Sequence, residues 1–220
     1  MKNIVIFGTS GHAKVIVDIL ERSSQYSIVG FIDDFKEKNT SFLGYEILGK
    51  TEDIPDLIVK TNLKGGIIAI GDNWVRKNVR DKIISLAPSF IFINAIHPEA
   101  QIAKNVQLGK GIAIMAGAII NSNSIIDDHC IVNTNSSLDH DSIMEEFSSL
   151  APGVTTGGNV RIGKFSAISL GANIIQGINI GEHAVVGAGS LVLENIADSV
   201  VAYGTPSKII RDRKKGEKYL

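Results

Sequence analysis

The chain has 220 residues, of which 44% are hydrophobic and 20% charged, enough for one ordinary domain and a second small one, each with a core. With 22 basic and 23 acidic residues, the formal net charge of −1 excludes the basic footprint of a nucleic-acid-binding protein. One cysteine excludes a disulfide framework, and the sequence shows neither a signal peptide nor a run of about 20 apolar residues. We therefore expect a cytoplasmic protein without a membrane span.

The first part of the chain has the pattern of a Rossmann-like α/β domain. Residues 2–8 and 27–34 read as buried parallel strands, and residues 12–23 between them carry apolar side chains at helical spacing. A third strand within 64–73 is followed by a helix at about 73–86. Strands that alternate with helices are typical of βαβ units. The expected fold class is thus a small Rossmann-like domain, over residues 1–88, ahead of a second architecture.

The turn between the first strand and helix reads Gly8-Thr9-Ser10-Gly11-His12. Its glycines let the backbone approach a phosphate, and the helix N-terminus offers unpaired N–H groups. A dinucleotide fingerprint would have a third glycine near Ala13, so the spacing also fits an ordinary strand-to-helix turn. Asp33 and Asp34 end the second strand, where an acidic residue meets a ribose or base. Two carboxylates at this point favour a single nucleotide.

From Ile96 to Val192 an aliphatic residue returns at every sixth position, with Thr156 as the one exception. This period is neither that of a helix nor an alternation, and it predicts a parallel β-helix in which three hexads form one coil. Stacked coils bury a continuous column of aliphatic side chains that one coil could not bury alone. Cys130 lies inside a hexad and reads as a small hydrophobe, whereas His129 and His183 read as exposed corner residues.

The hexads resemble those of left-handed β-helix acyltransferases, as in IGKFSA at 162–167, IGEHAV at 180–185 and VGAGSL at 186–191. The stretch YGTPSKII at 203–210 resembles their closing Gly-x-Pro-Ala-Lys motif, with Ser207 in place of alanine. The resemblance implies a left-handed β-helix with a short C-terminal helix. We expect the β-helix, which would bind acetyl-CoA, over residues 89–200 and a C-terminal tail over 201–220, its basic end from Arg211 solvated.

From Ile4 to about Arg211 the chain resembles bacterial sugar acetyltransferases that include the N-acetyltransferases of nucleotide-linked 4-amino-4,6-dideoxy sugars and the sialic-acid O-acetyltransferases. The resemblance implies a role in glycan or polysaccharide biosynthesis, a homotrimer with active sites between subunits, and acetyl-CoA as co-substrate without a metal. It also implies which residues hold the sugar nucleotide, and these are Ser10, Gly11, His12, Asp33, Asp34 and Gly71.

The same resemblance implies a general base. Acetyl transfer requires the attacking amine or hydroxyl to lose a proton, and a neutral histidine titrates in the right range. Family members have a histidine followed by an acid where this chain has His140 and Asp141, which implies His140 as base and Asp141 as its supporter. Adjacent strand residues point to opposite faces, so Asp139 remains a rival for that supporting role.

The resemblance places acetyl-CoA near backbone and side-chain groups on flat β-helix faces, at Asn133, Ser149, Gly158, Leu170 and Ala188. Ser149 departs from the pattern, because some relatives carry a second histidine nine places after the base.

The leading hypothesis is an acetyl-CoA-dependent N-acetyltransferase that acts on the 4-amino group of a nucleotide-linked dideoxy sugar. O-acetylation of a sialic acid or related free sugar acid is the alternative, although such a substrate gives Asp33 and Asp34 little to do. A γ-carbonic-anhydrase-like site needs three converging histidines, and His129, His140 and His183 show no paired spacing. A non-catalytic binding β-helix would leave His140 replaceable.

Overall fold

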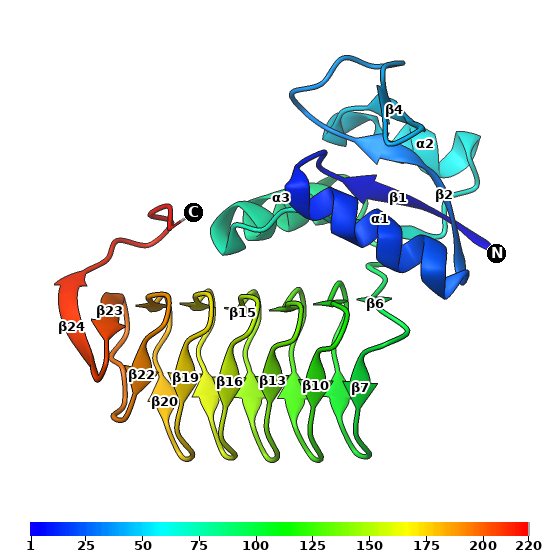
Figure 1. The fold of residues 1–220 in the computed structure, drawn as a ribbon. Coiled ribbons are helices and arrows are strands. Elements are labelled where there is room, and N and C mark those ends of the chain that lie inside the picture. Colours follow the sequence, from blue (N-terminus) through cyan, green and yellow to red (C-terminus); the bar gives the residue numbers. More distant parts are fainter. Residues whose placement is uncertain (220) are drawn as a thin grey trace. The chain divides into compact units, whose positions relative to one another are not determined.

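The computed structural model describes residues 1–219, and the chain forms two compact units (Figure 1). The first holds Met1–Gly71 and Val75–Pro98, and the second holds Asp72–Trp74 and the chain from Glu99 onward. The first unit extends ten residues beyond the expected boundary at 88, because Phe90 and Phe92 belong to its core. The backbone of this segment also joins the first unit, since Gly66 N–H donates to the Ile91 carbonyl at 3.0 Å.

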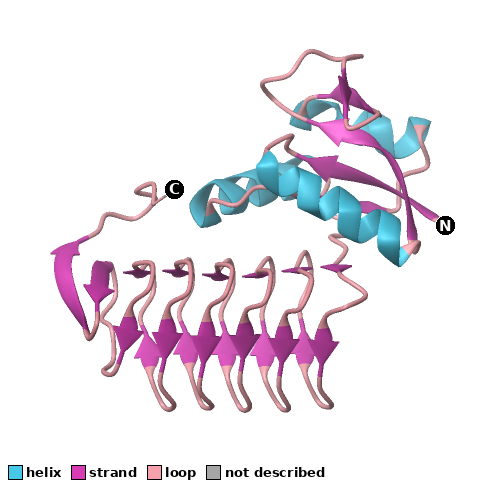
Figure 2. Cartoon of the chain, viewed as in Figure 1, coloured by secondary structure: helices cyan, strands magenta, loops and turns pink. Residues whose placement is uncertain are grey.

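A five-stranded sheet organises the first unit, with its strands in magenta and the helices of the unit in cyan in Figure 2. The strand order is β3-β4-β2-β1-β5. Strands β1, β2, β4 and β5 are parallel, and β3 pairs antiparallel with β4. The strands expected near 2–8, 27–34 and 64–73 and both expected helices are present, whereas β3, β4 and a short helix after them were not expected. The bounds are β1 (Lys2–Phe7), α1 (Gly11–Ser23), β2 (Tyr26–Ile32), β3 (Ser41–Phe42), β4 (Tyr45–Gly49), a 3₁₀ turn (Thr51–Asp53), α2 (Ile54–Lys60), β5 (Gly65–Ile68), α3 (Asn73–Leu86) and β6 (Ala95–Ile96).

The second unit is a parallel β-helix of two-residue strands. Residues 18 apart pair in register, as Ile119 does with Ser137, so three hexads complete one coil. Three sheets form its faces: β7 to β22 by threes, β8 to β20 by threes, and one that runs from β9 by threes to β21 and then β23 and β24. The strand bounds are β7 (Gln101–Ile102), β8 (Gln107–Leu108), β9 (Ala113–Ile114), β10 (Ile119–Ile120), β11 (Ile125–Ile126), β12 (Ile131–Val132), β13 (Ser137–Leu138), β14 (Ile143–Met144), β15 (Ser149–Leu150), β16 (Thr155–Thr156), β17 (Arg161–Ile162), β18 (Ala167–Ile168), β19 (Asn173–Ile174), β20 (Asn179–Ile180), β21 (Val185–Val186) and β22 (Leu191–Val192).

One corner of the β-helix is filled by aromatic rings. His129, Phe147, Phe165 and His183 stand 18 residues apart and stack with ring centroids 4.9, 5.5 and 4.7 Å apart. His129 and His183 are buried, so the expectation that they are exposed corner residues was wrong. Each ring covers its neighbour in the next coil, and Trp74 contacts Phe165 and His183 edge-on. We call these four stacked rings the aromatic column.

The C-terminal segment is a β-hairpin, and the expected short C-terminal helix is absent from the residues described. β23 (Val200–Gly204) extends the sheet of β21, and β24 (Ser207–Asp212) pairs with it antiparallel. β-branched residues favour strands, and Gly204-Thr205-Pro206 supplies the turn. The basic end is not solvated throughout, because Arg213 is buried and donates to the His183 carbonyl at 2.8 Å.

No helix within residues 1–219 has the length and apolar character needed to cross a membrane.

Candidate functional site

His140 and Asp141 form a close pair at another corner of the β-helix. The His140 Nδ1 lies 2.7 Å from the Asp141 Oδ2, although the two residues are neighbours in sequence. Asp141 has a left-handed backbone, with φ of 57°, and this turns its carboxylate back toward the ring. Both side chains are about half exposed, so the imidazole can be reached by a ligand.

Asp139 is engaged differently. Its Oδ1 accepts hydrogen bonds from the Asn121 side chain at 2.6 Å and from the His140 backbone N–H at 2.8 Å. Asn123 donates in the same way to the Asp141 Oδ1, at 3.2 Å. The side-chain amides of two residues in the preceding coil, Asn121 and Asn123, thus hold the carboxylates of Asp139 and Asp141. Sequence reasoning missed Asn121 and Asn123, although a shift of one 18-residue coil from Asp139 and Asp141 points to them.

The charges around His140 suit a proton acceptor. The hydrogen bond to the Asp141 carboxylate and the negative charge of Asp139 raise the pKa of the imidazole above its ordinary value. With Nδ1 donating to Asp141, the lone pair of the neutral ring lies on Nε2, which has no hydrogen-bond partner among the described residues. The arrangement can therefore take a proton from an incoming nucleophile.

Gly158 lies one coil after His140 and directly against its ring. A Cβ atom at position 158 would stand 2.6 Å from both the Cε1 and Nε2 atoms of His140, closer than real Cβ atoms come. Any side chain at this position would displace the imidazole. Gly158, which the family resemblance assigned to acetyl-CoA, is therefore also part of the surroundings of His140.

The other residues assigned to acetyl-CoA lie elsewhere on the β-helix. Leu170 and Ala188 are exposed and occupy equivalent places in successive coils, and Asn133 lies near the same corner two coils earlier. Ser149 is on β15, where its hydroxyl accepts a hydrogen bond from Asn73 at 3.2 Å. Asn133 lies beside β15, because its N–H donates to the Leu150 carbonyl at 3.1 Å, whereas none of Asn133, Leu170 and Ala188 lies at the corner that carries His140.

The turn before α1 leads into a half-buried histidine, His12. Burial, reinforced by the nearby Arg76 guanidinium, lowers the pKa of His12 to about 4, so its ring is neutral. The Nε2 atom of His12 is buried without a hydrogen-bond partner among the described residues. Arg76 is itself buried and donates to the carbonyls of Ile70 and Gly71, both at 2.9 Å, while Ser10 donates to Ala69. Ser10, Gly11, His12 and Gly71 therefore converge on one place, as a joint ligand-binding role requires.

Asp33 and Asp34 have different contacts. Asp33 accepts hydrogen bonds from the Thr9 hydroxyl at 2.6 Å and from the Phe35 N–H at 2.9 Å. Asp34 accepts one from the Thr51 N–H and pairs with Lys82 at 2.9 Å, which ties the loop after β2 to α3. A cavity of about 380 Å³ adjoins Asp33, lined by Thr9, Phe35, Lys36, Glu37, Thr40, Ser41, Phe42 and Ile47.

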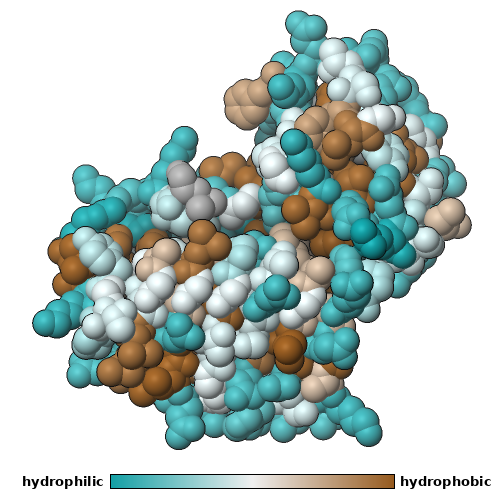
Figure 3. Space-filling model, in the orientation of Figure 1, coloured by the Kyte–Doolittle hydropathy of each residue, from teal (hydrophilic) through white to brown (hydrophobic). Residues whose placement is uncertain are grey.

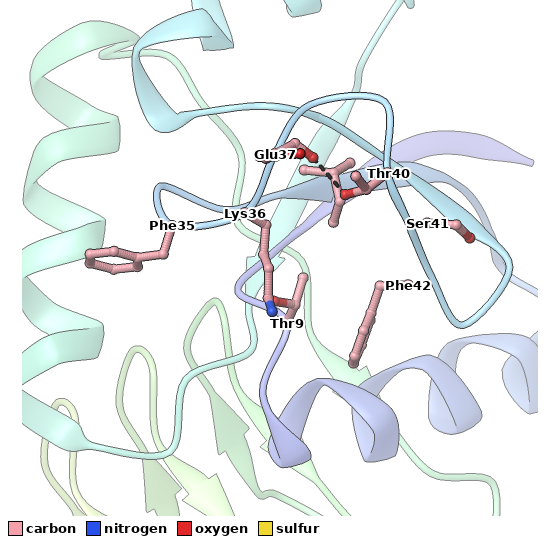
Figure 4. A pocket seen from close by; sticks show the side chains of 8 residues that line it. Thr9, Phe35, Lys36, Glu37, Thr40, Ser41 and Phe42 are labelled. Carbon is pink, nitrogen blue, oxygen red and sulfur yellow. Dashed lines mark hydrogen bonds between the residues drawn. The ribbon is translucent and has the colours of Figure 1, made fainter.

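Figure 4 shows Lys36 extended toward Thr9 in this cavity, while the Phe35 ring points away from them. The size suits part of a nucleotide, and the lysine offers a positive charge to an anionic group. Lys36 and Phe35 were missed from the sequence, where only the acidic pair stood out.

The histidines do not form a metal centre. His129 and His183 are separated by two phenyl rings in the aromatic column, and His140 belongs to another corner. Among the residues described, no group of three or more His, Cys, Asp or Glu side chains is arranged to hold a metal ion.

Comparison with known proteins identifies the family. Residues 3–83 match the PglD N-terminal domain. A GDP-perosamine N-acetyltransferase from Caulobacter crescentus, solved as a histidine-to-alanine mutant with CoA and GDP-perosamine, is 34% identical, with a TM-score of 0.90 over 96% of this chain and 98% of that one. The chain belongs to the hexapeptide-repeat sugar acetyltransferases.

Two further members of this family of acetyl-CoA-dependent enzymes are similar. The acetyltransferase domain of PglB from Neisseria gonorrhoeae, solved with acetyl coenzyme A, is 29% identical with a TM-score of 0.87, over 95% of this chain and 99% of that one. The UDP-N-acetylbacillosamine N-acetyltransferase of Bacillus subtilis is 34% identical over 53% of this chain and 52% of its own length. The chain thus spans about half the length of the curated relatives it matches.

Proposed function

We propose that this protein transfers the acetyl group of acetyl-CoA to the 4-amino group of a nucleotide-linked 4-amino-4,6-dideoxy sugar, with His140 as general base. The observation that carries the proposal is the His140–Asp141 pair, held at 2.7 Å on an exposed corner with Nε2 available to a ligand. An aspartate that accepts from Nδ1 fixes the tautomer and makes the imidazole more basic.

The chemistry needs only one proton acceptor. The amine nitrogen attacks the thioester carbonyl carbon, and His140 Nε2 takes the proton that the nitrogen loses. The carbon–sulfur bond then breaks, the amide forms, and the thiolate of CoA takes up the proton from His140. Asp141 stabilises the imidazolium between these two steps and returns to its starting charge state.

The first unit supports a nucleotide-linked substrate. The cavity beside Asp33 contains Lys36 and Thr9, which suit a phosphate and a ribose, and the turn at Gly8–His12 precedes the N-terminus of α1. Two similar proteins are named for GDP-perosamine and UDP-N-acetylbacillosamine, both amino sugars on a nucleoside diphosphate. A free sugar acid such as a sialic acid would leave these groups without a partner.

A homotrimer fits the positions of the remaining residues. Within one chain, Leu170 and Ala188 lie at a different corner from His140, so a slot between two β-helices would bring one chain's acetyl-CoA contacts to its neighbour's base. Apolar side chains are exposed along the β-helix, among them Ile102, Ile119, Leu170 and Ile175. Figure 3 shows apolar surface in separate patches on the side of the β-helix turned to the viewer.

Release of free thiol from acetyl-CoA tests the proposal. The purified protein is incubated with GDP-, UDP- and dTDP-linked 4-amino-4,6-dideoxy sugars, with the matching 4-hydroxy sugars as controls and with free sialic acid in a separate arm. We expect thiol release only with the amino sugars, and a product heavier by one acetyl group in mass spectrometry. Turnover of sialic acid without turnover of any nucleotide-linked amine would replace this function by O-acetylation.

A further inference from the structure

Thr156, the one exception to the aliphatic hexads, interrupts the hydrogen bonding between coils beside His140. At equivalent places on the same face, Ala103, Asn121, Gly157 and Ile175 each donate their backbone N–H to the carbonyl of the inward-facing residue in the next coil. Asp139 does not follow this rule, because its N–H donates to the Thr156 hydroxyl at 3.1 Å.

The strand pairing shows the same interruption. In the described coils each neighbouring pair on this face matches two residues, except that β13 and β16 pair only through Ser137 and Thr155. Thr156 is buried, and its hydroxyl oxygen replaces the main-chain carbonyl that accepts the equivalent N–H in the other coils. The backbone that leads into His140 is therefore held by a side chain that only this coil possesses.

Gly158 acts from the same hexad. The glycine has no Cβ, and one placed there would overlap the His140 ring at 2.6 Å. The Asn159 N–H also donates to the His140 carbonyl, at 2.9 Å. Gly158, the Asn159 N–H and the buried Thr156 hydroxyl thus define where the imidazole stands.

We infer that Thr156 and Gly158 are positioning residues for His140, and that the break in the aliphatic repeat exists to set the height and tilt of this imidazole. The inference rests on the proposed role of His140 as base. An aliphatic residue at 156 would either leave the Asp139 N–H without an acceptor or let it close onto the residue-156 carbonyl, and both outcomes shift the backbone that carries His140. Both residues act through His140, and neither gives or takes a proton.

Thr156→Val tests the inference, because valine keeps the volume and removes the hydroxyl. We expect kcat to fall about 10- to 100-fold with both KM values within twofold, since a small displacement of a catalytic group has effects of that order. Thr156→Ser retains the acceptor and should recover most of kcat. Thr156→Ile, the residue type usual at this place of the repeat, should lose kcat as valine does and is a second variant if valine folds poorly.

Ser166→Ala is the matched control. The Ser166 hydroxyl is also buried and accepts a backbone N–H, that of Ala184 at 2.8 Å, but it lies in another coil position away from His140. Ser166→Ala should therefore lower the melting temperature and leave kcat unchanged. In a His140→Ala background, Thr156→Val should cause no further loss of the residual rate.

The outcomes separate the two hypotheses. If His140→Ala is inactive and Thr156→Val keeps the wild-type kcat, the positioning role of Thr156 is wrong, whereas the role of His140 as general base is supported. If His140→Ala itself keeps more than half of kcat, the proposed base is wrong. Equal loss of kcat in Ser166→Ala and Thr156→Val would reduce the effect of Thr156 to general destabilisation.

Discussion

Asp141 reaches His140 because its backbone is left-handed. Alternation along a strand places neighbouring side chains on opposite faces, and from the sequence this left Asp139 and Asp141 as rivals. From Ile102 to Val186 the third residue after each inward-facing one turns the corner with positive φ, as at Asn123 and Asn135. Asp141 occupies that place after Leu138. The hexad register therefore identifies Asp141 as the partner of His140, but only once the geometry of the corner is known.

The first prediction concerns pH. The base is active when neutral, so activity is lost as the pH falls through the raised pKa of His140. Asp141→Asn removes the carboxylate whose hydrogen bond with His140 contributes most to this rise, and the acid limb of kcat/KM should move to lower pH while kcat falls. Asp139→Asn should move the limb in the same direction by less. Profiles of kcat/KM against pH for the three proteins measure this, and an unmoved limb in Asp141→Asn contradicts the pairing.

The second prediction separates the two acidic residues after β2. Asp33→Ala should raise the KM for the sugar nucleotide about tenfold with little change in melting temperature, because a hydrogen bond to a charged group is worth about 1.5–3 kcal/mol. Asp34→Ala should lower the melting temperature, since it releases Lys82 and the Thr51 N–H. Lys82→Met is the control, with a lower melting temperature and an unchanged KM. Calorimetry that finds normal nucleotide binding by Asp33→Ala would rule out its substrate role.

At the scale of elements, the aromatic column was visible in the sequence but was interpreted wrongly. His129 and His183 stand at a turn position, where exposed polar residues are usual, and Phe147 and Phe165 lie between them at the same 18-residue spacing. Rings at such places stack on one another, as Phe147 does on Phe165. The period that predicted the interior of the β-helix therefore also describes one of its corners.

The third prediction tests the column. Phe147 is 0% exposed, and Phe147→Ala should cost about 3–5 kcal/mol of unfolding free energy, as expected for a buried phenylalanine. Phe35→Ala makes the same chemical change at a side chain that is 97% exposed and should alter stability by less than about 0.5 kcal/mol. Denaturant unfolding of both variants measures the difference. Equal effects would show that the stacking contributes nothing.

Other elements could not be predicted because their signals are not local. Strands β3 and β4 are short and follow a polar loop, without a clear alternation along residues 41–49. For the C-terminal segment, the family resemblance alone implied a helix where the structure has a hairpin. Asn73 is buried, and its side chain donates to Ser149 and to the Phe165 and Ser166 carbonyls. No spacing links position 73 to these residues, so the contact required the fold.

At the scale of the whole molecule, the alternation of strands and helices and the hexad repeat predicted the two units. We propose that the complete site is formed by more than one chain. The fourth prediction is a trimer in sedimentation equilibrium, with each site shared between neighbours. Ala188→Trp, at an exposed position, should block acetyl-CoA without touching His140, whereas Gly158→Trp would displace the base as well. Mixed trimers of Ala188→Trp and His140→Ala chains should regain activity. A monomer, or confirmed mixed trimers without activity, is incompatible with the shared site.

The most direct test of the central claim is the turnover of His140→Ala with a nucleotide-linked 4-amino sugar and acetyl-CoA, measured at saturating concentrations beside the affinity for acetyl-CoA. Loss of a general base costs about 10²–10⁴-fold in rate, so we predict a kcat lower by that factor and an acetyl-CoA affinity within twofold of the wild type. A variant that retains more than half of the wild-type kcat would contradict the account and place the base elsewhere.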